Sequence, residues 1–291
     1  LERWDERYKP FLRILITARS ALSLDQLMAF SGSKRREDAI RYLDQLRQLL
    51  DPARLSTGMY QVYHRSIGEF FSKVERAQEY WIDAGEGHDS IASGCITEIN
   101  TRGGWKAVQA VNHQTAICDY ALSHLSIHLI GAKRWAALAD LLGDLSFLEA
   151  KSKWLGISAT LRDVHAALQQ TELSPQQSSA LYSILRVLQS EAPHLRYWAP
   201  ERFPSFFMQQ MRNRAVALGL LSIADRFLAR LNEMGKPSLQ LEWQSGLVTL
   251  AKTPELTTQL GGIHAVDIFM HGAKAVSGAS DGMLKVWDIQ S

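Results

Sequence analysis

The sequence predicts a mainly α-helical protein that ends in a short antiparallel β segment. Apolar residues recur at helical spacing, first in short stretches and then almost without interruption from about residue 80 to residue 236. Near the end, two stretches rich in strand-forming residues flank an Asp-Gly pair, which is typical of a tight turn between antiparallel strands. These patterns place helices over most of the molecule and strands only at its C-terminal end.

Composition and charge limit the classes of protein to which the chain can belong. Its 291 residues, 46% hydrophobic and 21% charged, suit a globular protein of about two or three domains. The formal net charge of +2 indicates neither a nucleic-acid partner nor a membrane surface. No apolar run approaches the length of a membrane span, and Cys95 and Cys118 lack the spacing of a metal site. We expect a cytoplasmic protein with reduced thiols and, because the chain opens on Leu1 rather than Met, one part of a longer protein.

Three short helices are predicted in the first part of the chain. The first begins at Pro10, a favourable residue for a first helical turn. The second opens with a capping box at Ser23–Gln26 and closes at Gly32. The third is expected from about residue 33 to residue 50. Its inward stripe is expected to comprise Ile40, Leu43, Leu46 and Leu50.

An extended segment over residues 59–64 follows these helices, and the whole order is typical of a winged-helix domain, which we assign to residues 1–74. The third helix of such a domain often enters the major groove of DNA. Here its basic residues are interleaved with acidic ones, so we do not expect nucleic acid to be the partner. The basic residues are Lys34, Arg35, Arg36, Arg41 and Arg47, and the acidic ones are Glu37, Asp38 and Asp44.

His64 is the candidate binding residue of this domain. Ser66 and Glu69 form a second predicted capping box, so a helix is expected to begin directly after His64. A helix N-terminus has free N–H groups and a partial positive charge that attract phosphate, and a histidine beside it can donate a hydrogen bond to an anion. The alternative is a histidine packed between strand and helix and satisfied by the backbone.

Residues 75–236 are predicted to form an array of helical hairpins. Turns are expected at residues 83–89 and 100–104, where glycine and polar residues cluster. No strict repeat of about 34 residues emerges, so we predict an irregular array and not tetratricopeptide repeats. The helices expected after these turns cover residues 115–130, 135–143, 161–168, 174–190, 204–218 and 223–234.

Two histidines of this array, His124 and His128, share one helix face. Their spacing suits two zinc ligands, but no third ligand and no His-Glu-x-x-His motif accompanies them, so we interpret both as packing residues. Aromatic residues further along are interpreted as a packed corner between helices and not as a peptide groove. These are Tyr197, Trp198, Phe203, Phe206 and Phe207.

No motif in the chain indicates catalysis. The sequence lacks a phosphate-binding loop of the form Gly-x-x-x-x-Gly-Lys-Ser/Thr, and it lacks an acidic strand that would seat magnesium. No nucleophile with a histidine base stands in a recognisable setting. We therefore expect no enzymatic activity, no metal and no cofactor in this chain.

The last part of the chain divides into a connector, residues 237–260, and a β segment, residues 261–291. The β segment has a strand, an Asp-Gly turn, a strand and a Trp-Asp pair in the order of a WD repeat, the unit that forms one blade of a β-propeller. We predict a first WD repeat of an incomplete propeller. The residues in place of the four side chains that brace such a blade are His264, Ser277, Asp281 and Trp287, with Ile263 inserted into the usual Gly-His pair.

Several stretches resemble the STAND class of signalling NTPases, which includes NACHT and NB-ARC proteins. The stretches are RYKPFLRILITARSALSLDQLMAF, YWIDAGEGHDSIA and YALSHLSIHLIGAKRWAALADLLGDLSFLEAK. The resemblance covers the winged helix, the helical linker and the first WD repeat. In that class, a histidine in a Met/Leu-His-Asp motif contacts the β-phosphate of bound ADP. Tyr63, His64 and Arg65 stand in the place of this motif, and Arg65 departs from the aspartate of the family.

The resemblance implies a regulatory, non-catalytic function. The parent protein would bind ADP or ATP in an upstream NTPase domain, and this chain would couple ligand sensing by a WD propeller to that nucleotide state. Its partners would be the upstream NTPase domain, downstream WD repeats and other proteins. Two alternatives remain: a winged-helix DNA-binding protein, and a protein-interaction scaffold without a link to nucleotide.

Overall fold

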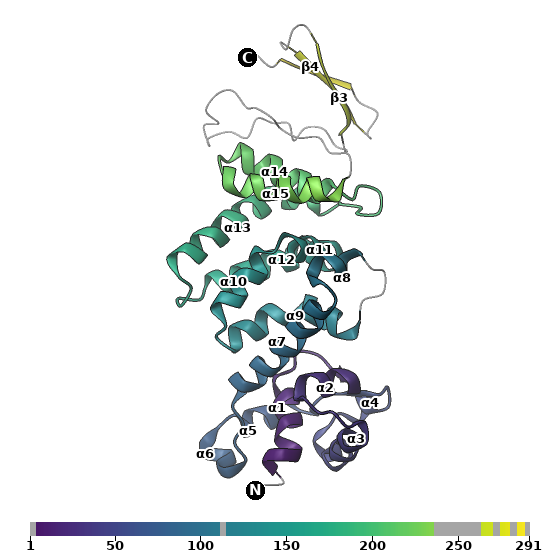
Figure 1. Cartoon of the computed structure of the whole chain (residues 1–291), viewed down its shortest axis with the longest axis vertical. Coiled ribbons are helices and arrows are strands. Elements are labelled where there is room, and N and C mark those ends of the chain that lie inside the picture. Colours follow the sequence, from purple (N-terminus) through teal and green to yellow (C-terminus); the bar gives the residue numbers. More distant parts are fainter. Residues whose placement is uncertain (1–3, 111–114, 236–262, 270–273, 280–283, 289–291) are drawn as a thin grey trace. The chain divides into compact units, whose positions relative to one another are not determined.

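The computed structural model describes residues 4–110, 115–235, 263–269, 274–279 and 284–288 (Figure 1). The chain divides into two compact units, Leu1–Glu242 and Trp243–Ser291. The described residues contain fifteen α-helices, all of them in the first unit, which confirms the prediction of a mainly α-helical protein. The connector predicted over residues 237–260 lies outside the described residues.

The first unit begins with a helix, a strand, two longer helices, a 3₁₀ turn, a four-residue helix and a second strand. After a π-helical turn (Trp4–Tyr8) come α1 (Lys9–Thr17), β1 (Leu22–Ser23), α2 (Leu24–Ser31), α3 (Arg36–Gln45) and β2 (Met59–Tyr60). The predicted capping box is present, with hydrogen bonds in both directions between Ser23 and Gln26. Gly32 ends α2 at a φ of +73°, a left-handed conformation that favours glycine. β1 pairs antiparallel with β2, with Leu22 opposite Tyr60.

The third helix is shorter than predicted. It ends at Gln45 and a 3₁₀ turn (Arg47–Leu49) follows, so the expectation of one helix over residues 33–50 is wrong at both ends. Ile40, expected to face inward, is 47% exposed. The buried positions are spaced by three and four residues, and Ile40 lies about 100° around the helix from the first of them. These buried residues are Ala39, Leu43, Leu46 and Leu50.

The extended segment predicted over residues 59–64 is also shorter. β2 spans two residues, and one further bridge joins Leu50 to Val62. Short helical elements lie on both sides of β2. The helix α4 (Pro52–Leu55) precedes it, and α5 (Arg65–Phe71), α6 (Val74–Ala77) and a 3₁₀ turn (Gln78–Tyr80) come after it. Trp4 stacks on Phe71 with ring centroids 5.8 Å apart, which ties the start of the described chain to α5.

Helix α7 (Ala84–Thr101) occupies the place of the turn predicted over residues 83–89, so that prediction is wrong. The glycines that suggested a turn serve close helix packing instead. A Cβ atom on Gly87 would lie 2.7 Å from a backbone oxygen of α1, and one on Gly94 would lie 2.6 Å from the ring of Phe30 in α2. Helix α7 packs against α1, α2 and α9.

The rest of the first unit is a succession of helices, most of which pack on their neighbours in the chain (Figure 1). They are α8 (Gly104–Ala110), α9 (Ala116–Gly131), α10 (Trp135–Gly143), α11 (Leu145–Leu155), α12 (Ile157–Leu168), α13 (Pro175–Leu195), α14 (Phe206–Ala217) and α15 (Leu221–Met234). The predicted helices are therefore present, although α12 begins earlier than predicted and α13 continues beyond Pro193.

The buried apolar side chains of this unit form one continuous core that extends from Phe11 to Leu231. It includes residues of α1 and α2, of α7 and of α9 to α15. Packing is therefore continuous past residue 74, the end of the domain that the sequence analysis assigned. The physical reason is α7, which presents apolar residues such as Ile91 and Cys95 to this shared core.

The second unit contains one antiparallel sheet with the strand order β3–β4–β5 among its described residues. The strands are β3 (Ile263–Phe269), β4 (Lys274–Ala279) and β5 (Leu284–Asp288). Val266 and Lys285 lie opposite Ser277, and Trp287 lies opposite Ala275. The predicted antiparallel segment is thus present at the C-terminal end of the chain.

Candidate functional site

His64 is the residue that begins α5. Its Nδ1 accepts a hydrogen bond from the backbone N–H of Ser66 at 3.1 Å and lies 2.8 Å from the Ser66 hydroxyl. The helix begins directly after His64, as predicted. The capping box predicted at Ser66 is wrong, because Ser66 already lies in the first turn, where its N–H needs an acceptor. Glu69 instead forms an ion pair with Arg65 at 3.1 Å.

The hydrogen bond to Ser66 determines what His64 can offer a ligand. A neutral imidazole that accepts at Nδ1 carries its proton at Nε2, so Nε2 is a donor. Among the described residues no hydrogen bond engages Nε2, and His64 is exposed. Tyr63 beside it is 67% exposed, and the Arg65 side chain is 89% exposed. The first turn of α5 thus presents a donor, a cation and an aromatic ring to solvent.

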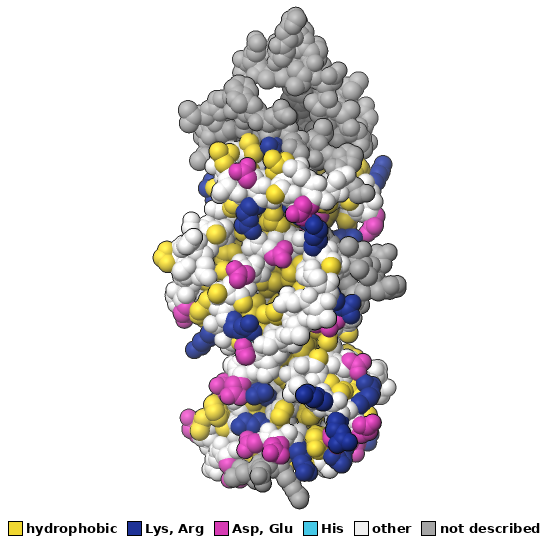
Figure 2. Space-filling view, viewed as in Figure 1, with side chains coloured by type: hydrophobic (Ala, Val, Ile, Leu, Met, Phe, Trp, Pro, Cys, Tyr) yellow, Lys and Arg dark blue, Asp and Glu magenta, His cyan; other side chains and the backbone are white. Residues whose placement is uncertain are grey.

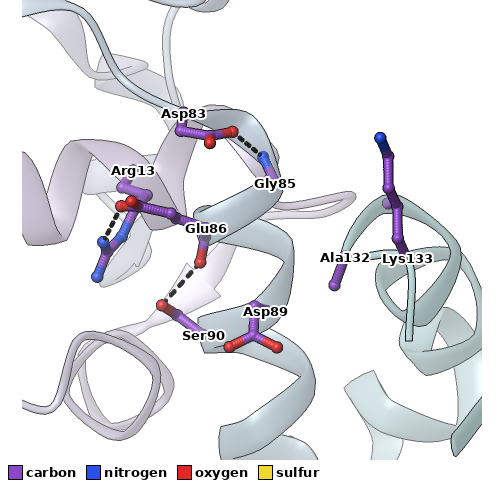
Figure 3. A pocket seen from close by; sticks show the side chains of 9 residues that line it. Arg13, Asp83, Gly85, Glu86, Asp89, Ser90, Ala132 and Lys133 are labelled. Carbon is purple, nitrogen blue, oxygen red and sulfur yellow. Dashed lines mark hydrogen bonds and ion pairs between the residues drawn. The ribbon is translucent and has the colours of Figure 1, made fainter.

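A polar pocket of about 510 Å³ lies where α1, the start of α7 and the end of α9 meet (Figure 3). Arg13 pairs with Glu86 at 2.8 Å, and Asp83 accepts the N–H of Gly85 at 2.7 Å. Lys133 lies across the pocket from these groups in Figure 3, at a left-handed φ of +56°. The lining therefore mixes both signs of charge, and most of its carboxylates already have partners.

Beside this pocket, a hydrogen-bonded chain of side chains joins three segments. The backbone N–H of Arg19, in the loop after α1, lies 3.1 Å from Tyr120 Oη. Tyr120 Oη lies 2.9 Å from His128 Nε2, and His128 Nδ1 lies 2.9 Å from Nδ1 of His88 in α7. His128 is fully buried, which confirms that it packs in the core. His124, half-buried, packs edge-on against Tyr120 with ring centroids 4.9 Å apart.

Burial keeps the three side chains of this hydrogen-bonded series in their neutral forms. It lowers the pKa of His88 from 6.5 to about 4, and nearby Arg19 contributes. It lowers the pKa of His128 to about 2, with His88 and Arg19 acting in the same direction. Burial also raises the pKa of Tyr120. All three side chains are therefore neutral at pH 7. Within the described residues, no group of three or more potential ligands is placed to hold a metal ion.

Two clusters of buried charge lie deeper in the helical array. Lys151 and Asp163, at 2.5 Å, form an ion pair whose side chains are 2% and 9% exposed, and Ser126 donates to the same carboxylate at 2.5 Å. Glu191 in α13 pairs with Arg214 of α14 at 2.5 Å. Lys151 and Asp163 are enclosed, whereas the Arg214 side chain is 26% exposed, and both pairs connect neighbouring helices.

The basic residues of α3 have acidic partners. Arg36 lies 2.5 Å from Asp25, and Arg41 lies 2.6 Å from Asp38. Figure 2 shows Lys and Arg side chains interspersed with Asp and Glu over the part of the surface that contains the first helices. Pairing lowers the positive potential that a phosphate backbone would require.

The aromatic residues between α13 and α14 are partly packed and partly exposed. Trp198 stacks on buried Phe207, with ring centroids 5.4 Å apart, and donates to the carbonyl of Phe203 at 2.9 Å. These contacts agree with the predicted packed corner. Tyr197, however, is 86% exposed and lies outside it, and the Phe203 side chain is 42% exposed.

The four residues predicted to brace the WD repeat are described to different extents. Ser277 in β4 is buried, with 2% exposure. His264 lies in β3 at an irregularity of the pairing with β4, between Ile263 and Ala265, and Trp287 lies in β5. Asp281 lies outside the described residues. The register places Ser277 and Trp287 on adjacent strands.

Sequence reasoning missed His88 and Tyr120 as partners of His128. His88 stood within the turn predicted over residues 83–89, and Tyr120 lay within the helix predicted over residues 115–130 without being singled out. His88 lies 40 residues from His128 and meets it through the packing of α7 on α9, whereas Tyr120 lies eight residues earlier in the same helix, α9. Tyr120 and His128 stood in one predicted helix, which was the available signal for that pair, and no local pattern linked His88 to His128.

Comparison with known proteins adds no relative: no family model and no curated protein matches the chain. The resemblance to STAND-class proteins therefore supports a proposal and not an assignment. Among the helices that the structure describes, none combines the length and the apolar character needed to cross a bilayer.

Proposed function

We propose that this chain is a non-catalytic regulatory segment of a STAND-type signalling ATPase. It couples ligand sensing by a WD propeller to the ADP or ATP state of an NTPase domain upstream in the parent protein. The observation that carries the proposal is His64: it begins a helix, is exposed, and uses Nδ1 for the backbone so that Nε2 is a donor. This is the hydrogen-bonding state required of a histidine that contacts the β-phosphate of ADP.

The surrounding elements support the same interpretation. α1, β1, α2, α3 and β2 follow one another in the order of a winged helix, with β1 and β2 paired. The second unit contributes three antiparallel strands at the place predicted for the first WD repeat. The proposed partners are the upstream NTPase domain, further WD repeats and other proteins, and the proposed compartment is the cytoplasm.

Replacing His64 in the full-length parent protein tests the proposal. His64→Ala removes one charge-assisted hydrogen bond to ADP, worth about 1.5–3 kcal/mol. The loss of this bond can shift the equilibrium between the ADP-bound and the active state by no more than the free energy of the bond. We therefore expect ADP release to rise roughly ten- to hundredfold, with a higher basal activity. Release of labelled ADP measures the effect, and His165→Ala, at an exposed position of α12, is the control.

The alternatives give different results in the same protein. If His64→Ala retains ADP as the wild type does, the interaction-scaffold interpretation is favoured. The DNA-binding interpretation requires binding to duplex DNA that weakens steeply with salt, and the paired cations of α3 argue against it. A phosphate-binding loop encoded upstream in the same reading frame is the most direct discriminating observation.

A further inference from the structure

The chain of hydrogen bonds from Arg19 to His88 has one arrangement of protons that satisfies every member. The backbone N–H of Arg19 can only donate, so Tyr120 Oη accepts it. The Tyr120 hydroxyl hydrogen then goes to His128 Nε2. His128 must carry its proton on Nδ1, from which it donates to His88 Nδ1. His88 in turn carries its proton on Nε2.

One added proton reverses this order. Protonated His88 is a donor at Nδ1, so His128 must accept there and move its own proton to Nε2. Nε2 then donates to Tyr120 Oη, which already accepts from Arg19. The hydroxyl hydrogen of Tyr120 is left without its acceptor in a buried site, which is unfavourable.

We propose that this chain of hydrogen bonds is an acid-sensitive latch that holds α7, α9 and the loop after α1 together at neutral pH and releases them in acid. His88 is its proton entry point, because it is half-buried whereas Tyr120 and His128 are buried. The His88 ring also lies against the backbone of α9, since a Cβ on Gly131 would be 2.5 Å from it. Loss of the His88 contact therefore acts directly on the α7–α9 interface.

The charged and titratable neighbours make a protonated imidazole unfavourable in the closed latch, which favours its release in acid. Arg19 opposes a positive charge on both imidazoles, and His124 opposes one on His128. Cys95 of α7 faces Tyr120 and is neutral, because burial raises its pKa. Lys151 and Asp163 act with opposite signs on His124. Among the described residues, no carboxylate pairs with either member of the His88–His128 pair.

The pH range follows from the lowered pKa values of His88 and His128, about 4 and about 2, against 6.5 for a free histidine. The latch is fully stabilising above pH 6.5, and the stabilisation is lost as pH falls from 6.5 towards 4 for His88 and towards 2 for His128, because the released state takes up the protons first. For two histidines, the opening equilibrium rises on the order of a hundredfold between pH 7.5 and 5.5.

Hydrogen exchange of the full chain at pH 7.5 and 5.5, corrected for intrinsic exchange, tests the latch. We expect opening of α7 and α9 to increase about a hundredfold in acid, while α15, which contains no histidine, changes little. His88→Gln keeps an acceptor for His128 but removes one titrating group, so its increase should be about tenfold. His165→Gln, at an exposed position, is the matched control and should behave as the wild type.

Two outcomes overturn the latch. One is a pH response in His88→Gln as large as that of the wild type, and the other is an acid response in α15 as large as that in α7 and α9. Should His88→Gln fail to fold, nitrogen NMR of the wild-type imidazoles decides instead. At pH 7 the latch requires neutral His128 with its proton on Nδ1. A protonated His128, or a proton on Nε2, contradicts the proposal.

Discussion

At the scale of single residues, the first unit contains a buried ion pair whose contribution to the free energy of unfolding depends on both partners being charged. Lys151 in α11 contacts Asp163 in α12 and donates to the carbonyl of Leu122 in α9 at 2.8 Å. Burial lowers the pKa of Lys151, and Asp163 opposes that effect. The pair thus connects three helices, at the cost of desolvating two charges.

Asp163→Asn keeps the shape of the side chain but removes its charge and leaves a buried ammonium group without a counterion. We expect the free energy of unfolding to fall by about 3–5 kcal/mol, measured by urea denaturation. The double variant Lys151→Met with Asp163→Asn should lose less, because no unpaired charge remains.

The matched control for this experiment is Arg102→Ala. It breaks a solvent-exposed pair with Glu98 at 2.6 Å and should cost less than about 1 kcal/mol. Equal losses from Asp163→Asn and Arg102→Ala would show that the buried pair contributes no more than an exposed one.

At the scale of elements, α7 is the helix on which the first helices and the later array both pack. Its close approach to α1 depends on Gly87, where any side chain would meet a backbone oxygen and Thr17 at 2.7 Å. Backbone cannot move aside as the end of a flexible side chain can. The helix therefore uses glycine in its interior despite the poor helix propensity of that residue.

Gly87→Ala is predicted to lower the melting temperature. Alanine favours the helix by about 1 kcal/mol, but overpacking against α1 costs about 1–3 kcal/mol, so we expect a net loss. Gly68→Ala in α5 is the control, since its Cβ would lie 3.6 Å from the nearest atom and should be neutral or stabilising. A stabilised Gly87→Ala variant would contradict the close contact between α1 and α7.

At the scale of the whole molecule, the main core and the C-terminal sheet belong to different compact units. The core that runs from Phe11 to Leu231 lies within Leu1–Glu242, and the sheet lies within Trp243–Ser291. A single sheet of three short strands buries far less apolar surface than the helical core of the first unit, and burial of apolar surface is the main stabilising contribution. The two units should therefore differ in stability.

Deleting residues 262–291 should leave the first unit folded. We expect the helical circular dichroism per helical residue and the urea midpoint to stay close to those of the full chain, because the core is retained. In the full chain, hydrogen exchange from residue 263 onward should be faster than in α9 and α10. Unfolding of the truncated chain, or equal protection of strands and helices, would contradict this prediction.

Local signals in the sequence determined much of the helical fold. The capping box at Ser23, the glycine at position 32 and the start of α5 after His64 were all predicted, because each depends on hydrogen bonds within about four residues. Periodicity likewise located the helices after residue 115, except for α11 and the first turn of α12. The WD-like repeat and the nucleotide contact of His64 remain predictions from the sequence.

Only the tertiary structure decided which polar groups meet. The sequence read residues 83–89 as a turn, because glycine in a turn and glycine at a tight helix contact look alike without the partner helix. His88 and His128 are 40 residues apart, and Ser126 and Asp163 are 37 apart, so no local pattern links them. Their pairing is set by burial, because a polar group removed from water must find a partner among whatever groups packing brings within reach.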